Sequence, residues 1–257
     1  MQRAFVAGLM IAIIAPLIGI FLVTRRYALM ADTLSHIALA GVALGVLIGV
    51  QPVVSAVLTA VIGAVSIETL RRKRAAQGEQ LLSLFLSGGL AIAVILMSIA
   101  PGGNANFVSY LFGSITTVSQ TDVSLILGLG LLVILTVTIL YKKLFLLSVD
   151  EELAEAGGIK ASIYNTILVI LAAVTVSLSM RIVGILLVGA LMVIPVLTGM
   201  QIARSFRHTL IIAVICSLLS VTGGLFISYY GNLASGGTIV ICALGFFLLA
   251  LGWKGVR

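Results

Sequence analysis

Asp32 and His36 are the residues of this sequence whose types and spacing best suit chemistry. Residues four apart lie on the same face of a helix, so this carboxylate and this imidazole can approach one ion together. Both groups are ligands for divalent metals such as zinc and manganese. The same spacing also suits a structural pair, in which the two side chains bond to each other or to a neighbouring backbone. The spacing alone does not choose between metal binding and structural pairing.

The composition places this pair within a membrane protein. Of the 257 residues, 61% are apolar and only 9% carry a charge, which leaves too little polar surface for a soluble enzyme of this size. A membrane-crossing helix needs about 20 apolar residues, so the chain provides for roughly eight or nine crossings. The sequence has no GxxxxGK[ST] phosphate-binding loop. Any nucleotide that drives transport must therefore bind to another chain.

Nine apolar runs, separated by charged or glycine-, proline- and asparagine-rich breaks, are expected to form these crossings. By residue number they are approximately 4–24, 31–50, 52–70, 80–100, 122–141, 161–180, 182–202, 208–229 and 237–253. Counted from Arg26 at a rise of about 1.5 Å per residue, His36 lies about 15 Å deep in a hydrocarbon core of about 30 Å. We therefore expect the pair near the membrane midplane, where transporter sites are common.

The basic residues indicate how the chain is oriented in the lipid bilayer. Placing the basic cluster of residues 71–74 in the cytoplasm also places there every other Lys and Arg except Arg3 and Arg181. The C-terminus is then cytoplasmic and the N-terminus external. The formal net charge of +7 therefore reflects orientation and not nucleic-acid binding, because the basic residues lie in short turns between apolar runs.

Three glycines recur every four residues in the second run, at Gly41, Gly45 and Gly49. A stripe without side chains lets another helix backbone approach closely. We therefore expect this run to be a packed, interior helix.

Elsewhere, Glu68 precedes the basic cluster and is expected to pair with it. The aromatic segment 106–113 is too short to span the membrane and is expected to lie at its outer interface, as an anchor or a lid.

The segment 148–160 departs from the basic character of the cytoplasmic side. It contains four of the eight acidic residues of the chain, namely Asp150, Glu151, Glu152 and Glu155. Asp150 is expected to cap a short helix that Gly157 or Gly158 ends. A helix of one or two turns is not stable alone. The segment is therefore either a solvated connector or a helix that lies on its own membrane domain or on a partner protein.

The stretch 25–45 (RRYALMADTLSHIALAGVALG) resembles the signature of the permease subunits of bacterial zinc/manganese ABC importers. The resemblance covers essentially the whole chain. Further matching segments are YLFG at 110–113, Asp150 with Ala154 and Gly158, GILLVGALMVIP at 184–195, and GLF at 224–226 leading into GTIV at 237–240. The turn 230–236 departs from the family pattern because it lacks the Asp and Pro of many relatives, which puts in doubt a role for this turn in metal handling.

The resemblance implies a fold and a function. The fold is an all-α polytopic transmembrane bundle of about eight or nine spans, like the vitamin B12 importer (type II), with residues 1–257 as one domain. The function is a homodimeric permease in the bacterial cytoplasmic membrane, which is not itself an enzyme and has no covalently bound cofactor. It would receive zinc, or next manganese, from an extracytoplasmic binding protein and pass it inward by alternating access. A separate ATPase subunit would bind and hydrolyse ATP.

The resemblance also implies roles for particular residues. Asp32 and His36 would bind the transported metal. The segment 148–160 would contact the ATPase, with the coupling residues Asp150, Glu151, Glu152, Ala154, Glu155, Gly157 and Gly158. The alternative is a secondary carrier in which Asp32 and His36 exchange protons for a metal ion without an ATPase. Zinc is favoured over manganese on overall similarity.

Overall fold

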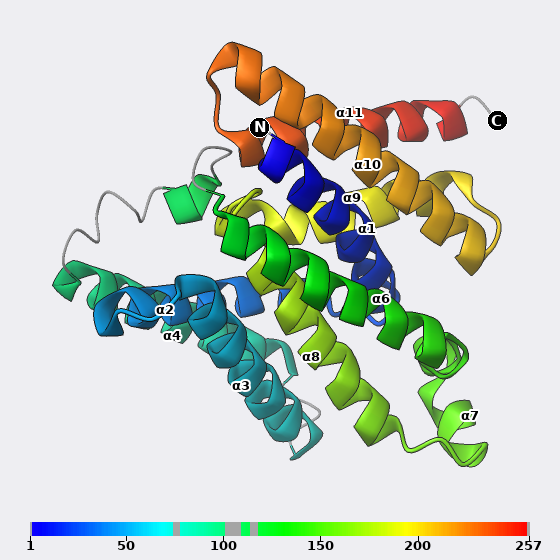
Figure 1. Ribbon diagram of the computed structural model, residues 1–257. Coiled ribbons are helices and arrows are strands. Elements are labelled where there is room, and N and C mark those ends of the chain that lie inside the picture. Colours follow the sequence, from blue (N-terminus) through cyan, green and yellow to red (C-terminus); the bar gives the residue numbers. More distant parts are fainter. Residues whose placement is uncertain (1, 74–77, 101–108, 114–117, 256–257) are drawn as a thin grey trace.

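The computed structural model describes residues 2–73, 78–100, 109–113 and 118–255, with side chains to residue 252, and all the regular structure in these ranges is helical (Figure 1). The helices are α1 (Gln2–Thr24), α2 (Ala28–Ile48), α3 (Pro52–Lys73), α4 (Gly78–Ile99), α6 (Gln120–Val149), α7 (Glu151–Ala156), α8 (Ala161–Ser179), α9 (Ile185–Ile202), α10 (Phe206–Gly231) and α11 (Ser235–Gly255). In the described ranges, nine helices are long and apolar enough to cross a membrane. They correspond to the nine predicted runs, and this prediction is confirmed.

Helix α6 is longer than the sequence predicted. We expected it to end before the basic pair Lys142 and Lys143, but it continues to Val149 and has 30 residues. Basic residues do not break a helix, and aromatic packing holds the additional turns in place. Phe145 stacks on Tyr141 and also lies edge-on to a ring of α10. The helix therefore extends beyond its apolar part.

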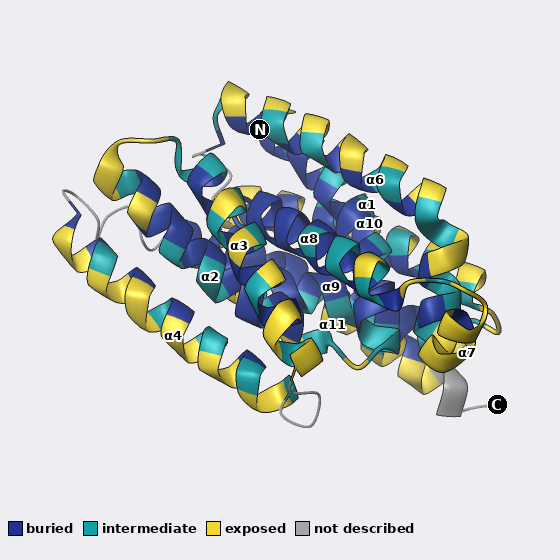
Figure 2. Cartoon of the chain, turned by 90° about the horizontal axis from the view of Figure 1, so that it is seen from below, coloured by how far each residue is buried: buried dark blue, intermediate teal, exposed yellow. Residues whose placement is uncertain are grey.

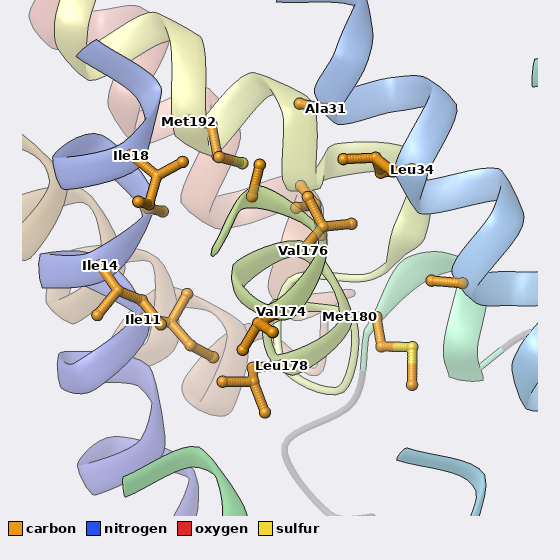
Figure 3. Packing of buried hydrophobic residues seen from close by; sticks show 14 of the residues in the cluster. Ile11, Ile14, Ile18, Ala31, Leu34, Val174, Val176, Leu178, Met180 and Met192 are labelled. Atoms are coloured by element: carbon orange, nitrogen blue, oxygen red, sulfur yellow. The ribbon is translucent and has the colours of Figure 1, made fainter. Parts of the chain in front are cut away.

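The core lies between α1, α2, α8 and α9, which are the most buried of the helices, whereas α4 and α6 expose much of their surface (Figure 2). Ile11, Ile14 and Ile18 of α1 lie beside Val176 of α8 and Met192 of α9 (Figure 3). The outer helices present apolar side chains outward, such as those at positions 92, 95 and 99 of α4. An apolar exterior around a packed apolar core is the arrangement expected of a helical bundle in lipid.

The glycines of α2 have two different roles. A Cβ atom at Gly41 or Gly45 would lie within 3 Å of α3, at residues 55–59, so both positions allow α2 and α3 to approach closely. Gly49 is different, because it follows the helix in the left-handed conformation (φ 72°) and a Cβ there would meet nothing within 4 Å. The expected packing stripe therefore needs a correction at Gly49, which ends α2 as its C-cap.

A buried ion pair joins the ends of the helices on the face assigned to the outside. Arg181, between α8 and α9, lies 3.2 Å from the carboxylate of Asp122, at the start of α6. Gln51 donates a hydrogen bond to Asp122 over 3.1 Å, and Ser119 completes a capping box with it. The Asp122 side chain is fully buried. This network links the turn before α3 to the starts of α6 and α9.

We expect Asp122→Ala to destabilise the protein by about 3–5 kcal/mol, because it leaves the largely buried Arg181 charge, whose side chain is 15% exposed, without its carboxylate partner. The measurement is thermal unfolding of the purified protein in detergent. Asp122→Ala combined with Arg181→Leu is the control, and it should recover part of the loss, because no unpaired charge is then buried. A double variant less stable than Asp122→Ala alone would contradict this explanation.

Candidate functional site

The local backbone sets the position of Asp32 and His36. After α1 the chain turns sharply at Arg26, which has a left-handed backbone (φ 60°), and the Tyr27 N–H donates to the Leu22 carbonyl over 2.7 Å. Helix α2 then begins at Ala28. His36 lies about 12 Å along α2, in a helix about 30 Å long. His36 thus lies in the middle part of the helix, and Asp32 lies one turn nearer to its start.

His36 has a buried ring nitrogen whose hydrogen-bonding capacity is unused among the described residues. Among the described residues, its Nδ1 atom has no hydrogen-bond partner. Its ring interacts electrostatically with the Asp32 carboxylate, one turn earlier. A buried polar atom without a partner costs about 1–3 kcal/mol. The structure therefore does not satisfy this histidine as a closed structural pair would.

The pair lies on a stripe of α2 that the described chain leaves partly exposed. The residues of this stripe, spaced three or four apart, are Leu29, Asp32, His36, Ala40, Leu44 and Leu47. The opposite face of α2, which includes Leu34 and Ala38, is fully buried. Because it carries a carboxylate and an imidazole, the stripe is poorly suited to lipid. It is suited to a water-filled path or to a second protein surface.

Two glycines from other helices fit closely around the pair. A Cβ atom at Gly189 of α9 would lie 1.9 Å from Oδ1 of Asp32, and one at Gly89 of α4 would lie 3.0–3.3 Å from the α2 backbone at His36 and Ile37. Helix α9 therefore leaves room for the carboxylate only because residue 189 has no side chain. Gly189 lies within the segment 184–195 that carries the family resemblance, but the sequence could not show which residue it faces.

One copy of the chain brings two candidate metal ligands, Asp32 and His36, together at this place. In the part of the chain that the structure describes, no group of three or more His, Cys, Asp and Glu side chains is close enough to hold a metal ion. Bound zinc usually has four ligands. Water or a second protein chain must therefore complete a metal site that contains Asp32 and His36.

The predicted short helix of the segment 148–160 is present as α7, beside the ends of α6 and α8 (Figure 1). Asp150 caps it by accepting a hydrogen bond from the Leu153 N–H over 2.9 Å. Gly157 follows as its C-cap, and Gly158 has a left-handed backbone (φ 81°). Asp150 as the N-cap and the two glycines as the end of the helix are as the sequence predicted.

The two faces of α7 differ. Ala154 is fully buried and packs with Leu147 of α6 and Ala161 of α8. The other predicted coupling residues are exposed, namely Asp150, Glu151, Glu152, Glu155, Gly157 and Gly158. Leu153 is also exposed, to 60%, and sequence reasoning missed it because nothing local shows which way a side chain of a two-turn helix points. Ala154 thus holds α7 on the membrane domain, and Leu153 extends away from it.

The predicted pairing of Glu68 is confirmed. Its carboxylate lies 3.3 Å from the Arg71 guanidinium, one turn later on α3. The Arg71 guanidinium in turn lies over the Tyr27 ring, 4.1 Å from its centroid.

The aromatic segment 106–113 can be described only at residues 109–113. There, Tyr110 is buried and its ring centroid lies 5.0 Å from the Arg181 guanidinium. The rest of that segment lies outside the described residues.

Comparison with known proteins shows the family of the chain. The sequence pattern of the ABC 3 transport family matches residues 1–254. The chain belongs to this family. The high-affinity zinc uptake system membrane protein ZnuB of Haemophilus influenzae is 33% identical over 249 residues, which cover 96% of this chain and 95% of ZnuB. The manganese import system permease protein ScaB of Streptococcus gordonii is 30% identical over 250 residues, which cover 97% of this chain and 90% of ScaB.

A solved structure shows the same fold. PsaBC from Streptococcus pneumoniae, solved in complex with Fab, is similar to the present chain, with a TM-score of 0.88 and 30% sequence identity. The match covers 97% of the present chain and 90% of the PsaBC chain. The resemblance to zinc/manganese importer permeases and the all-α bundle are therefore both confirmed. The relatives are named for two different metals, so membership of the family does not choose between them.

Proposed function

We propose that this ABC 3 family chain is the membrane-spanning subunit of an ATP-driven importer of divalent metal, located in the bacterial cytoplasmic membrane. The observation that carries the proposal is the buried Nδ1 of His36, which has no hydrogen-bond partner among the described residues and lies one turn from Asp32 in the middle of α2. An imidazole nitrogen and a carboxylate together are a divalent-metal ligand set. Relatives named as zinc and manganese permeases support the same cargo.

A second copy of the chain would complete the site. Two copies related by a two-fold axis bring the same surface of each together. The partly exposed stripe of α2 is suited to that role, because it carries the pair and is left uncovered by the described chain. Asp32 and His36 from both copies would give four protein ligands, the usual number for zinc. This arrangement accounts for the absence of a third ligand in the described part of one copy.

The domain organisation follows from the same proposal. Residues 1–257 form one integral membrane domain, and the segment 148–160 is its contact with the ATPase subunit. Helix α7 supports this role because its buried face fixes it to α6 and α8, while its acidic residues and Leu153 are exposed. An extracytoplasmic binding protein would deliver the metal at the opposite face, and alternating access would carry it across.

Zinc is the proposed cargo, with manganese next. Imidazole is a preferred ligand of zinc, whereas manganese is better suited to oxygen ligands. A site with one imidazole for each carboxylate therefore favours zinc. The identities of 33% to the zinc permease and 30% to the manganese permease point the same way without deciding the question.

The test is metal uptake into proteoliposomes that contain this chain with its ATPase subunit and binding protein. We expect radioactive zinc to accumulate only when ATP is supplied on the ATPase side, with unlabelled zinc competing better than manganese. Uptake by the chain alone, driven by a proton gradient, would overturn the proposal in favour of a secondary carrier. Uptake under neither condition would overturn both.

A further inference from the structure

Arg25, in the turn between α1 and α2, connects three separate parts of the chain. Its guanidinium donates a hydrogen bond to the side-chain oxygen of Asn165 on α8 and another, over 2.8 Å, to the Leu147 carbonyl near the end of α6. Burial lowers the pKa of the Arg25 guanidinium, and the charge of Glu151 opposes this change. Its two terminal nitrogens are paired in this way, while its Nε has no hydrogen-bond partner among the described residues. The geometry of this turn is therefore fixed by α6 and α8.

Asn165 extends the connection to α7. It is buried, and its amide nitrogen donates a hydrogen bond to the Glu151 carboxylate over 2.8 Å. Glu151 is the first residue of α7. One asparagine thus accepts from Arg25 and donates to Glu151. The three side chains form a continuous polar chain from α7 to the start of α2, which we call the Arg25 relay.

The turn at Arg25 also controls where α2 begins. The left-handed Arg26 and the bond from the Tyr27 N–H to the Leu22 carbonyl make the turn compact. Only two residues separate Arg25 from the start of α2 at Ala28, and Asp32 follows in its second turn. A helix moves as a rigid element, so a displacement of its first turn also moves the Asp32 and His36 side chains.

A cavity of about 700 Å³ lies beside the relay. Its lining includes Glu151 and Asn165 of α7 and α8 and, from the end of α3 and the start of α4, Arg72 and Glu79. Arg25, Arg26 and Tyr27 of the turn also line it. The relay is therefore a polar link that borders this cavity.

We propose that Arg25 and Asn165 are positioning residues through which movement of α7 reaches the metal pair on α2. The inference rests on the proposed function, because it requires α7 to be the ATPase contact and Asp32 and His36 to bind the cargo. Movement of α7 displaces Glu151, Asn165 transmits the displacement to Arg25, and the turn transmits it to the first part of α2. Neither positioning residue touches the metal.

The geometry requires an arginine at position 25 and not only a positive charge. The guanidinium fork reaches the Asn165 oxygen and the Leu147 carbonyl with two different nitrogens. A lysine has a single nitrogen on a flexible stem and cannot reproduce this fixed fork. Arg25→Lys therefore keeps the charge of the turn but removes the rigid connection.

The experiment measures zinc uptake and ATP hydrolysis together in proteoliposomes that contain the assembled transporter. Arg25→Lys and Asn165→Ala are each expected to lower the ratio of zinc transported to ATP hydrolysed by about tenfold. Hydrolysis itself, co-purification of the ATPase and zinc binding by the assembled protein should stay within about twofold of the parent. Arg72→Gln is the matched control, because it removes an exposed arginine from the same cavity, and it should leave the ratio unchanged.

A double variant separates a relay from two independent defects. If Arg25 and Asn165 act as one unit, Arg25→Lys with Asn165→Ala should have about the same transport ratio as the worse single variant. The inference would be overturned if the double variant lowered the transport ratio by the product of the two single effects. It would also be overturned if both single variants kept a ratio within about twofold of the parent. Either result would leave the proposed function in place. If the parent itself shows no ATP-driven uptake, the proposed function fails and the relay fails with it. These two kinds of failure are therefore distinguishable.

Discussion

Replacing Asp32 with Ala and His36 with Ala together is expected to lower zinc uptake by about 100-fold or more, because both proposed protein ligands from each copy are lost. The variant should still assemble with its ATPase, because the pair lies on a partly exposed stripe of α2. Uptake of radioactive zinc into ATP-loaded proteoliposomes measures the effect. Zinc binding by the purified complex should fall in parallel.

The matched control for the double variant is Ser35→Ala. Ser35 lies between the two proposed ligands in sequence but is buried on another face of α2, where its hydroxyl donates only to the Ala31 carbonyl over 2.8 Å. Its loss should change uptake by less than about twofold, because such a bond within one helix contributes little. If the double variant transported zinc at the parental rate, the pair would not be the metal site.

Gly189→Ala offers a second approach to the same site without removing a ligand. Its new Cβ would lie 1.9 Å from Oδ1 of Asp32, so the carboxylate must move away from α9. The expected result is weaker zinc binding and lower uptake in the same assay, with both proposed ligands still present. Gly88→Ala is the matched control, because a Cβ at that position on α4 would meet nothing within 4 Å.

The features that the sequence predicted well are those set by neighbours along the chain. The placement of Asp32 and His36 one turn apart on one face of α2, the Glu68 pairing and the caps of α7 each depend on residues within one or two helical turns, so spacing and residue type are sufficient to find them. The nine spans were predicted for a similar reason, because the length of an apolar run is a local property. The family resemblance then added the expectation that the pair binds metal, which stays a prediction.

The features that the sequence did not predict depend on contacts between distant segments. Gly189 faces Asp32, and Arg25 reaches Asn165 across 140 positions; neither partner can be named before the helices are placed. The end of α6 was misplaced because its last turns are held by an aromatic contact with Phe206 of α10 and not by apolar content. The role of Gly49 was misjudged for a related reason, since a packing glycine and a C-cap glycine look the same in sequence.

Leu153→Asp is expected to weaken binding of the ATPase by about 30-fold or more, and with it to remove ATP-driven uptake. Leu153 is 60% exposed on a helix whose other side is fixed by the buried Ala154. An apolar side chain held outward in this way suits a pocket on the partner, and an unpaired carboxylate buried there would be costly. The measurement is co-purification of the ATPase with the variant, followed by uptake in proteoliposomes.

Leu233→Asp is the control for Leu153→Asp, because Leu233 is similarly exposed, to 57%, but lies between α10 and α11 on the face assigned to the outside. It introduces the same charge on an exposed leucine and should leave ATPase binding unchanged. Leu153→Met should also bind normally, because it keeps an apolar side chain of similar volume. Binding is the discriminating measurement, because loss of uptake alone would also follow from a defect at the metal pair or in the Arg25 relay. Normal co-purification of Leu153→Asp would show that the exposed face of α7 does not hold the ATPase through Leu153.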